Sequence, residues 1–220
     1  MKALVFGGSG LVGRELLALL SADMSFSEII SAGRSVVHDL DDRIQQLTIN
    51  MEALDTQPEL FASDIVFCCL GTTIGKAGSK EAFKLVDLHY VSRIAQMAAA
   101  QGVACMAVIS SMGADPTSYN FYLRTKGRME QAVCATHIPH IIIARPGLLR
   151  GKRNEFRFAE KTAAMLLPVI EWMMIGSLKN YRSINAIEVA AALIQAGKER
   201  HNQIIRTHEL KLLAKKYLSA

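Results

Sequence analysis

The sequence opens with Lys2-Ala-Leu-Val-Phe6, and Gly7-Gly8-Ser9-Gly10-Leu11-Val12-Gly13 follows at once. The first run is apolar enough for a buried strand, and the residues after Gly13 have the pattern of an amphipathic helix. Strand, glycine turn and helix in this order are typical of a dinucleotide-binding unit, because the glycines allow a sharp turn and close backbone approach to a pyrophosphate. The first N–H groups of the helix would face the phosphates. The opening therefore predicts a Rossmann-like α/β fold with a bound nucleotide.

Strand and helix patterns alternate behind this turn. Strands are expected at 28–32, 46–49, 64–70, 104–109 and 140–144, with a long helix over 79–101 and another from about 120. The segment 64–70 is almost continuously apolar, as in a parallel strand that helices cover on both faces. We therefore predict a doubly wound parallel sheet.

The alternation weakens after residue 150. Helices are expected at 155–165, 187–198 and 210–217, and a last strand at 203–205. We predict a single NAD(P)-binding Rossmann domain over 1–220, in which 1–150 form the cofactor-binding core and 151–220 a small C-terminal helical and substrate region. Methionines and Trp172 in the apolar stretch 163–176 suit core packing, a substrate pocket or a subunit contact.

Composition narrows the class of protein. The 220 residues are 50% hydrophobic and 20% charged, with a net charge of +5, which is typical of a soluble globular chain. The basic residues are scattered, so we expect no nucleic-acid binding, and 163–176 is too short for a membrane span. Four cysteines without a Cys-x-x-Cys or metal-ligand spacing suit small core residues in a reducing compartment. We therefore expect a cytoplasmic protein with no metal site.

The end of the second expected strand bears on the choice of cofactor. An acidic residue near this point holds the ribose hydroxyls of NAD, whereas an arginine accommodates the 2′-phosphate of NADP. The strand ends in Gly33-Arg34-Ser35 and has no Asp or Glu there. Arg34 therefore favours NADPH over NADH. Arg14 is either a second phosphate contact or a surface residue.

Polar residues suited to catalysis follow the strand at 104–109. Ser110 and Ser111 end this strand, and Tyr122 and Lys126 lie four residues apart on the next helix, hence on one face. Hydride transfer to a carbonyl needs a matching proton, but an unperturbed tyrosine, with a pKa near 10, exchanges protons poorly at neutral pH. A neighbouring ammonium stabilises the phenolate. This pattern predicts Tyr122 as the proton donor, assisted by Lys126.

Together these motifs resemble the atypical short-chain dehydrogenase/reductase superfamily. Within it, the stretch 67–73 (Phe-Cys-Cys-Leu-Gly-Thr-Thr), Val86-Asp87, the segment 110–115 and Tyr122-Leu-x-x-Lys-Gly127 look like the Tat-interacting-protein-like NAD(P)H-binding oxidoreductases. The likeness covers residues 1 to about 150. It implies a Rossmann sheet, NADPH as the cofactor and catalytic positions at Ser111, Tyr122 and Lys126, with Ser110 as a rival for the serine.

The glycine turn and the resemblance together imply a set of cofactor-binding residues. These are Gly7, Ser9, Gly10, Leu11, Val12, Gly13, Arg34, Asn50, Leu70, Gly71, Thr72, Lys126 and Pro146. The predicted function is NADPH-dependent reduction of a small carbonyl or quinone substrate. The alternative is an NADPH-binding redox sensor or scaffold with little or no turnover, with a homodimer or a protein partner left open.

Overall fold

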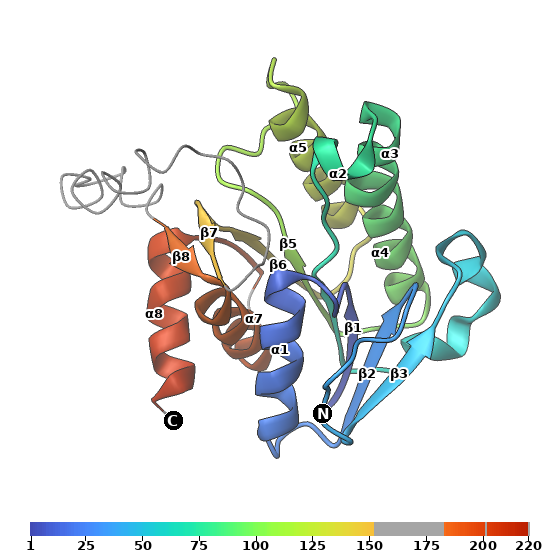
Figure 1. Cartoon of the computed structure of the whole chain (residues 1–220), viewed down its shortest axis with the longest axis vertical. Coiled ribbons are helices and arrows are strands. Elements are labelled where there is room, and N and C mark those ends of the chain that lie inside the picture. Colours follow the sequence, from blue (N-terminus) through green and yellow to red (C-terminus); the bar gives the residue numbers. More distant parts are fainter. Residues whose placement is uncertain (152–182, 201, 220) are drawn as a thin grey trace.

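The computed structural model describes residues 1–151, 183–200 and 202–219. Within them, a seven-stranded parallel sheet carries helices on both faces, as Figure 1 shows. The strand order is β3-β2-β1-β4-β5-β6-β9, so the chain begins in the interior of the sheet and builds outward first on one side and then on the other. This order confirms the predicted Rossmann-like, doubly wound sheet.

The strands are short and mostly buried. Their bounds are β1 Lys2–Phe6, β2 Glu28–Gly33, β3 Ile44–Thr48, β4 Ile65–Cys68, β5 Cys105–Ile109, β6 His140–Arg145 and β9 Gln203–Arg206. Each neighbouring pair is parallel. A separate two-residue pair joins β7 (Leu149–Arg150) to β8 (Ile184–Asn185).

The helices form two layers. One layer consists of α1 (Leu11–Ala22), α7 (Ala186–Glu199) and α8 (Thr207–Leu218), and α4 (Val91–Ala100) and α5 (Phe121–Cys134) cover the other face (Figure 1). The short helices are η1 Met51–Thr56, η2 Pro58–Phe61, α2 Ile74–Ala77 and α3 Lys80–Lys84, and the π-helical turn η3 Leu85–Tyr90 connects α3 to α4.

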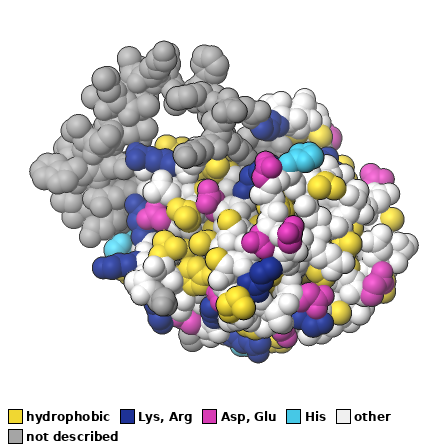
Figure 2. Space-filling model, turned by 60° about the horizontal axis from the view of Figure 1, so that its bottom comes forward, with side chains coloured by type: hydrophobic (Ala, Val, Ile, Leu, Met, Phe, Trp, Pro, Cys, Tyr) yellow, Lys and Arg dark blue, Asp and Glu magenta, His cyan; other side chains and the backbone are white. Residues whose placement is uncertain are grey.

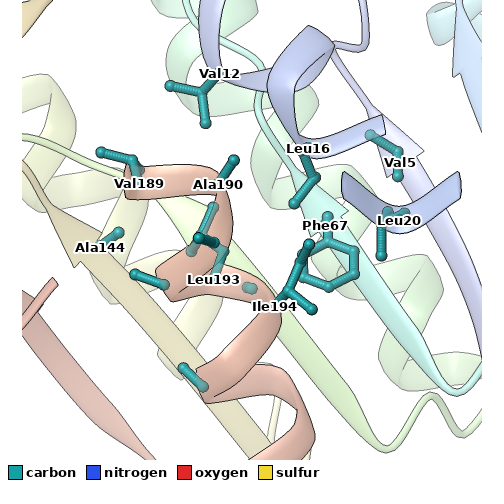
Figure 3. Close-up of a cluster of buried hydrophobic side chains, with 14 of the residues drawn as sticks. Val5, Val12, Leu16, Leu20, Phe67, Ala144, Val189, Ala190, Leu193 and Ile194 are labelled. Carbon is teal, nitrogen blue, oxygen red and sulfur yellow. The ribbon is translucent and has the colours of Figure 1, made fainter. Parts of the chain in front are cut away.

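One apolar core lies between the sheet and the layer that contains α1 and α7. Figure 3 shows Leu16 and Leu20 of α1 and Leu193 and Ile194 of α7 around Phe67 of β4. All five side chains are completely buried, and each such burial contributes roughly 2 kcal/mol relative to an exposed position. The C-terminal part of the chain thus supports the helix that follows the glycine turn.

A second apolar core lies on the opposite face, because successive strand residues point to opposite sides of the sheet. Phe6 of β1 packs here against Phe61, with ring centroids 5.9 Å apart. Val91 and Ile94 of α4 and Met129 of α5 are fully buried in the same core. This packing places α5, with Tyr122 and Lys126, on the face of the sheet that α4 also covers.

Several details differ from the sequence-based predictions. The third strand occupies Ile44–Thr48 rather than 46–49, and the long helix over 79–101 consists of α3, η3 and α4. The pairing of β7 with β8 was not predicted, since two-residue strands have no periodicity to detect. The expected helix at 155–165 and the apolar stretch 163–176 with Trp172 lie outside the described residues.

The cysteines only partly occupy the core positions expected for them. Cys68 and Cys105 are buried, and burial raises the pKa of the Cys68 thiol to about 12. Cys134 at the end of α5 is exposed, contrary to the expected core position.

On the face that Figure 2 shows, basic and acidic side chains are interspersed. In the part of the chain that the structure describes, no helix is both long and apolar enough to cross a membrane.

A polar cluster connects the end of α1 to α7 and α8. Asp23 Oδ2 lies 2.6 Å from Lys198 Nζ and accepts a hydrogen bond from Tyr217 Oη at 2.9 Å. Burial alone would raise the pKa of Asp23, but hydrogen bonds from Lys198, Ser25 and Tyr217 together lower it to about 2. The ionised carboxylate therefore stabilises the packing of these three helices.

We expect Asp23→Asn to lower the free energy of unfolding at neutral pH by roughly 2 kcal/mol, because the carboxyl pKa falls from 3.8 to about 2 on folding. Since the folded pKa lies below the unfolded value, this stabilisation is complete above about pH 4 and is lost as the pH falls through about 2. Urea unfolding of both proteins across this pH range measures it. A difference that stays constant with pH would contradict the assignment.

Candidate functional site

Two loops meet where the strand order reverses. From β1 the chain continues to β2 and β3 on one side of the sheet, and it then returns to β4 on the other side of β1. Ligands of open α/β sheets bind at the carboxyl ends of the strands that flank such a switch point. The glycine turn follows β1 and the Leu70–Thr72 loop follows β4. The fold therefore brings together two predicted binding segments that are far apart in the sequence.

The glycines of the first turn are required by close contacts. Gly7 has a φ of +82°, and a Cβ atom there would lie 2.6 Å from the carbonyl carbon of Cys69. A Cβ atom on Gly13 would lie 2.1 Å from Gly7 O. No side chain can be accommodated at these distances, so only glycine lets the turn approach the loop after β4 and lets α1 pack against β1.

The start of α1 is suited to an anion. Its N-cap residue, Gly10, provides no side-chain cap, and its first turn has no acidic residue. The first N–H groups of a helix have no partner within the helix, and the positive end of the helix dipole lies there. Ser9 beside this turn is exposed. The residues present therefore fit the pyrophosphate of a dinucleotide.

Arg34 and Asn50 follow β2 and β3, on the half of the sheet away from α5. Arg34 is exposed, and its side chain forms no ion pair with any residue that the structure describes. Asn50 caps η1, because its Oδ1 accepts a hydrogen bond from Glu52 N at 3.0 Å. Arg34 is thus available to an anionic ligand, whereas the side-chain oxygen of Asn50 has a local structural role.

The serine pair lies beside Pro146. Ser110 N donates to Ala144 O at 2.7 Å, and Met112 N donates to Pro146 O at 3.0 Å, which extends the β5–β6 pairing past the strand ends. Ser110 is only 4% exposed, and its Oγ has no hydrogen-bond partner among the described residues. Ser111 is half-buried, and its Oγ makes a long contact with Met112 O at 3.4 Å. Ser111 is therefore the more accessible of the two.

Tyr122 lies in the first turn of α5. Asn120 caps this helix by accepting a hydrogen bond from Leu123 N at 3.1 Å. The Tyr122 ring packs against Phe83 with centroids 5.7 Å apart, and the side chain is half-buried. Its hydroxyl forms no hydrogen bond with the described residues. The ring is therefore supported on one side while the hydroxyl has no competing partner there.

Lys126 lies one turn further along α5 and is buried, at 4% exposed. Its Nζ lies 2.7 Å from Asp87 Oδ1 and donates to Ile109 O at 3.4 Å. The Asp87 contact is an ion pair that is not aligned as a hydrogen bond. Asp87 itself is completely buried.

This ion pair lies next to the loop after β4. Asp87 Oδ2 accepts a hydrogen bond from Thr72 N at 2.8 Å. A Cβ atom on Gly71 would lie 3.6 Å from Asp87 Oδ1 and 4.0 Å from Lys126 Nζ. The structure therefore brings Gly71, Thr72 and Lys126, all predicted from the sequence, into one cluster around an acidic residue that was not predicted.

Asp87 was missed although the sequence contains a signal for it. Phe83, Asp87 and Val91 are four residues apart in an expected helix, and an acidic residue between two apolar residues at this spacing indicates a buried charge. The family resemblance includes Asp87 in the Val86-Asp87 motif but assigns it no role. A buried charge needs a partner, and a lysine on the next helix was the available one.

A second ion pair supports the loop after β6. Arg145 Nε donates to Glu130 Oε1 at 2.9 Å, and Arg145 Nη2 contacts Glu130 Oε2. This hydrogen bonding raises the pKa of Arg145. Glu130 is buried on α5, so the pair joins α5 to the backbone beside Pro146. No sequence motif predicted this pair, whose two residues are 15 positions apart.

Comparison with known proteins identifies the family of this chain. A family model described as NAD(P)H-binding matches residues 7–200. Protein FMP52, mitochondrial, of Debaryomyces hansenii is 33% identical over 160 residues, which cover 70% of each chain. Protein HTATIP2 of Rattus norvegicus is 34% identical over 160 residues, which cover 71% of this chain and 66% of the rat protein.

Two solved structures are similar in fold. MoeE5 in complex with UDP-glucose and NAD has a TM-score of 0.71 at 13% identity, covering 98% of this chain and 81% of that chain. UDP-glucuronic acid 4-epimerase from Bacillus cereus in complex with NAD has a TM-score of 0.70 at 15% identity, covering 94% and 78%. At these identities the similarity concerns the fold alone.

The relatives contradict the expected cytoplasmic location, because FMP52 proteins of several fungi are named as mitochondrial. Composition and the lack of a long apolar segment were the basis of that prediction. Neither property distinguishes one aqueous compartment from another.

Proposed function

The chain belongs to the NAD(P)H-binding family, and we propose that it is an NADPH-dependent oxidoreductase that reduces a carbonyl or quinone substrate. The similarity to HTATIP2 and FMP52 confirms the resemblance to the Tat-interacting-protein-like branch. The observation that carries the proposal is the contact of Gly7 with the Cys69 backbone at the switch point, with Lys126 beside the adjoining Gly71.

The cofactor would be held by two groups of residues. The glycine turn and the first N–H groups of α1 suit the pyrophosphate, and Arg34 suits a 2′-phosphate. Leu70, Gly71 and Thr72, with Lys126 beside them, would hold the nicotinamide half together with Pro146. When bound, NADPH supplies a hydride to the substrate carbon.

The side chains of α5 and of the loop after β5 would complete the reaction. Tyr122 Oη donates a proton to the substrate oxygen as the carbon receives the hydride, so that an alcohol forms. With a quinone, the product becomes the hydroquinone once that carbon loses its proton and the second oxygen gains one. The Lys126 ammonium stabilises the resulting phenolate, and the Ser111 hydroxyl donates a hydrogen bond that orients the oxygen. Ser111 is preferred over Ser110 because a substrate can reach only a hydroxyl that is accessible.

Titration with NADPH and, separately, NADH tests the cofactor. We expect tighter binding of NADPH, and we expect Arg34→Ala to weaken NADPH binding about tenfold while NADH binding changes less than about twofold, since one charge-assisted contact is lost. Nicotinamide fluorescence is the measurement. Arg128→Ala, which removes another exposed arginine, is the matched control and should bind both nucleotides like the wild type.

The outcomes separate the two parts of the proposal. An equal loss for NADPH and NADH in Arg34→Ala would remove Arg34 from 2′-phosphate recognition, and Arg14→Ala would then test the other candidate. Failure of the wild-type protein to bind either nucleotide would contradict the reductase proposal as a whole.

A further inference from the structure

Asp87 contacts both the predicted cofactor loop and the predicted catalytic lysine. Its Oδ2 accepts a hydrogen bond from Thr72 N at 2.8 Å, and its Oδ1 pairs with Lys126 Nζ at 2.7 Å. We infer that Asp87 is a positioning residue that couples the Leu70–Thr72 loop to Lys126. Nucleotide binding at the loop then depends on Lys126, and the bound nucleotide in turn orients the Lys126 ammonium. This inference rests on the proposed function.

The location of Asp87 supports a specific role. It lies within the π-helical turn η3, between α3 and α4, and single π-helical turns inside longer helices are uncommon and occur frequently at functional sites. Asp87 is completely buried between Phe83 and Val91, which are also completely buried. A carboxylate without partners would be strongly disfavoured there, so the burial of Asp87 depends on its contacts with Lys126 and Thr72.

The charge arrangement leaves Lys126 able to bind a ligand. A lysine ammonium has three N–H donors. Within the described part of the chain, Nζ donates a hydrogen bond to Ile109 O at 3.4 Å and is held beside Asp87 Oδ1 by the ion pair. Donor capacity therefore remains for a hydroxyl of the nicotinamide ribose or for the tyrosine. Asp87 restricts where the ammonium can point.

The coupling is testable through NADPH affinity alone. We expect Asp87→Asn to weaken NADPH binding about tenfold, as for the loss of one charged hydrogen-bonding partner. The same substitution made in a Lys126→Met background is expected to change affinity less than about twofold. This double-mutant cycle isolates the interaction, because an effect that passes through Lys126 disappears once the lysine is absent.

Asp23→Asn is the matched control. Asp23 is likewise ion-paired to a lysine, with 13% of its side chain exposed, but it lies at the far end of α1 from the glycine turn. It should lose stability without losing NADPH affinity. Wild-type affinity in Asp87→Asn, or effects of Asp87→Asn and Lys126→Met that simply add, would overturn the inference, whereas an absence of binding by the wild type would overturn the proposed function instead.

A measurement on the wild-type protein covers the case in which a variant does not fold. Thr72 N–H donates to a buried carboxylate, whereas Gly71 is exposed. We therefore expect the Thr72 amide to exchange with deuterium at least about tenfold more slowly than the Gly71 amide, and more slowly again with NADPH bound. Equal exchange rates at the two amides, or no change on addition of NADPH, would overturn the coupling.

Discussion

Tyr122→Phe is expected to reduce turnover of a carbonyl or quinone substrate about 100- to 10,000-fold, the usual contribution of a positioned general acid. The substitution removes only the hydroxyl, and the ring keeps its contact with Phe83. NADPH affinity should therefore change less than about twofold, since lost proton transfer alone does not affect cofactor binding. NADPH oxidation measures turnover, and nicotinamide fluorescence measures binding.

Tyr119→Phe provides the control for this variant. Tyr119 is fully exposed in the loop just before α5, so the loss of its hydroxyl should leave turnover unchanged. Turnover by Tyr122→Phe at the wild-type rate would exclude Tyr122 as the proton donor. If the wild type binds NADPH but turns over no substrate in a broad panel, the redox-sensor or scaffold alternative gains support.

Lys126→Met is expected to lower the free energy of unfolding by about 3–5 kcal/mol, the usual cost of leaving one member of a buried ion pair without its partner. Asp87 is completely buried, and Lys126 is its charge partner at 2.7 Å. Adding Asp87→Asn removes the orphaned charge, so the double variant should recover more than half of the loss. Urea denaturation at neutral pH measures both effects.

A lysine on the surface provides the comparison. Lys215 on α8 is exposed, and Lys215→Met should change stability by less than about 0.5 kcal/mol. If the double variant is as unstable as Lys126→Met, the cost does not come from an uncompensated Asp87, and the ion pair has no special energetic role.

The C-terminal part of the chain was the hardest to predict. The sequence indicated a helix at 187–198 and a strand at 203–205, and both exist as α7 and β9. The sequence did not indicate that β9 extends the main sheet beside β6, or that α7 packs against α1. Such contacts depend on which apolar faces match in space, and periodicity along the chain carries no information about this.

The sequence by itself determined the alternation of strands and helices from which a Rossmann-like sheet is predicted, the glycine turn, and the spacing of Tyr122 and Lys126. These are local properties, because side-chain periodicity, the conformational freedom of glycine and the pitch of a helix act within a few residues. The tertiary structure alone decided that Asp87 faces Lys126 and holds Thr72 N. This contact depends on how η3 is rotated relative to α5. It also depends on burial, because a carboxylate removed from water is stable only beside a charged or hydrogen-bonding partner.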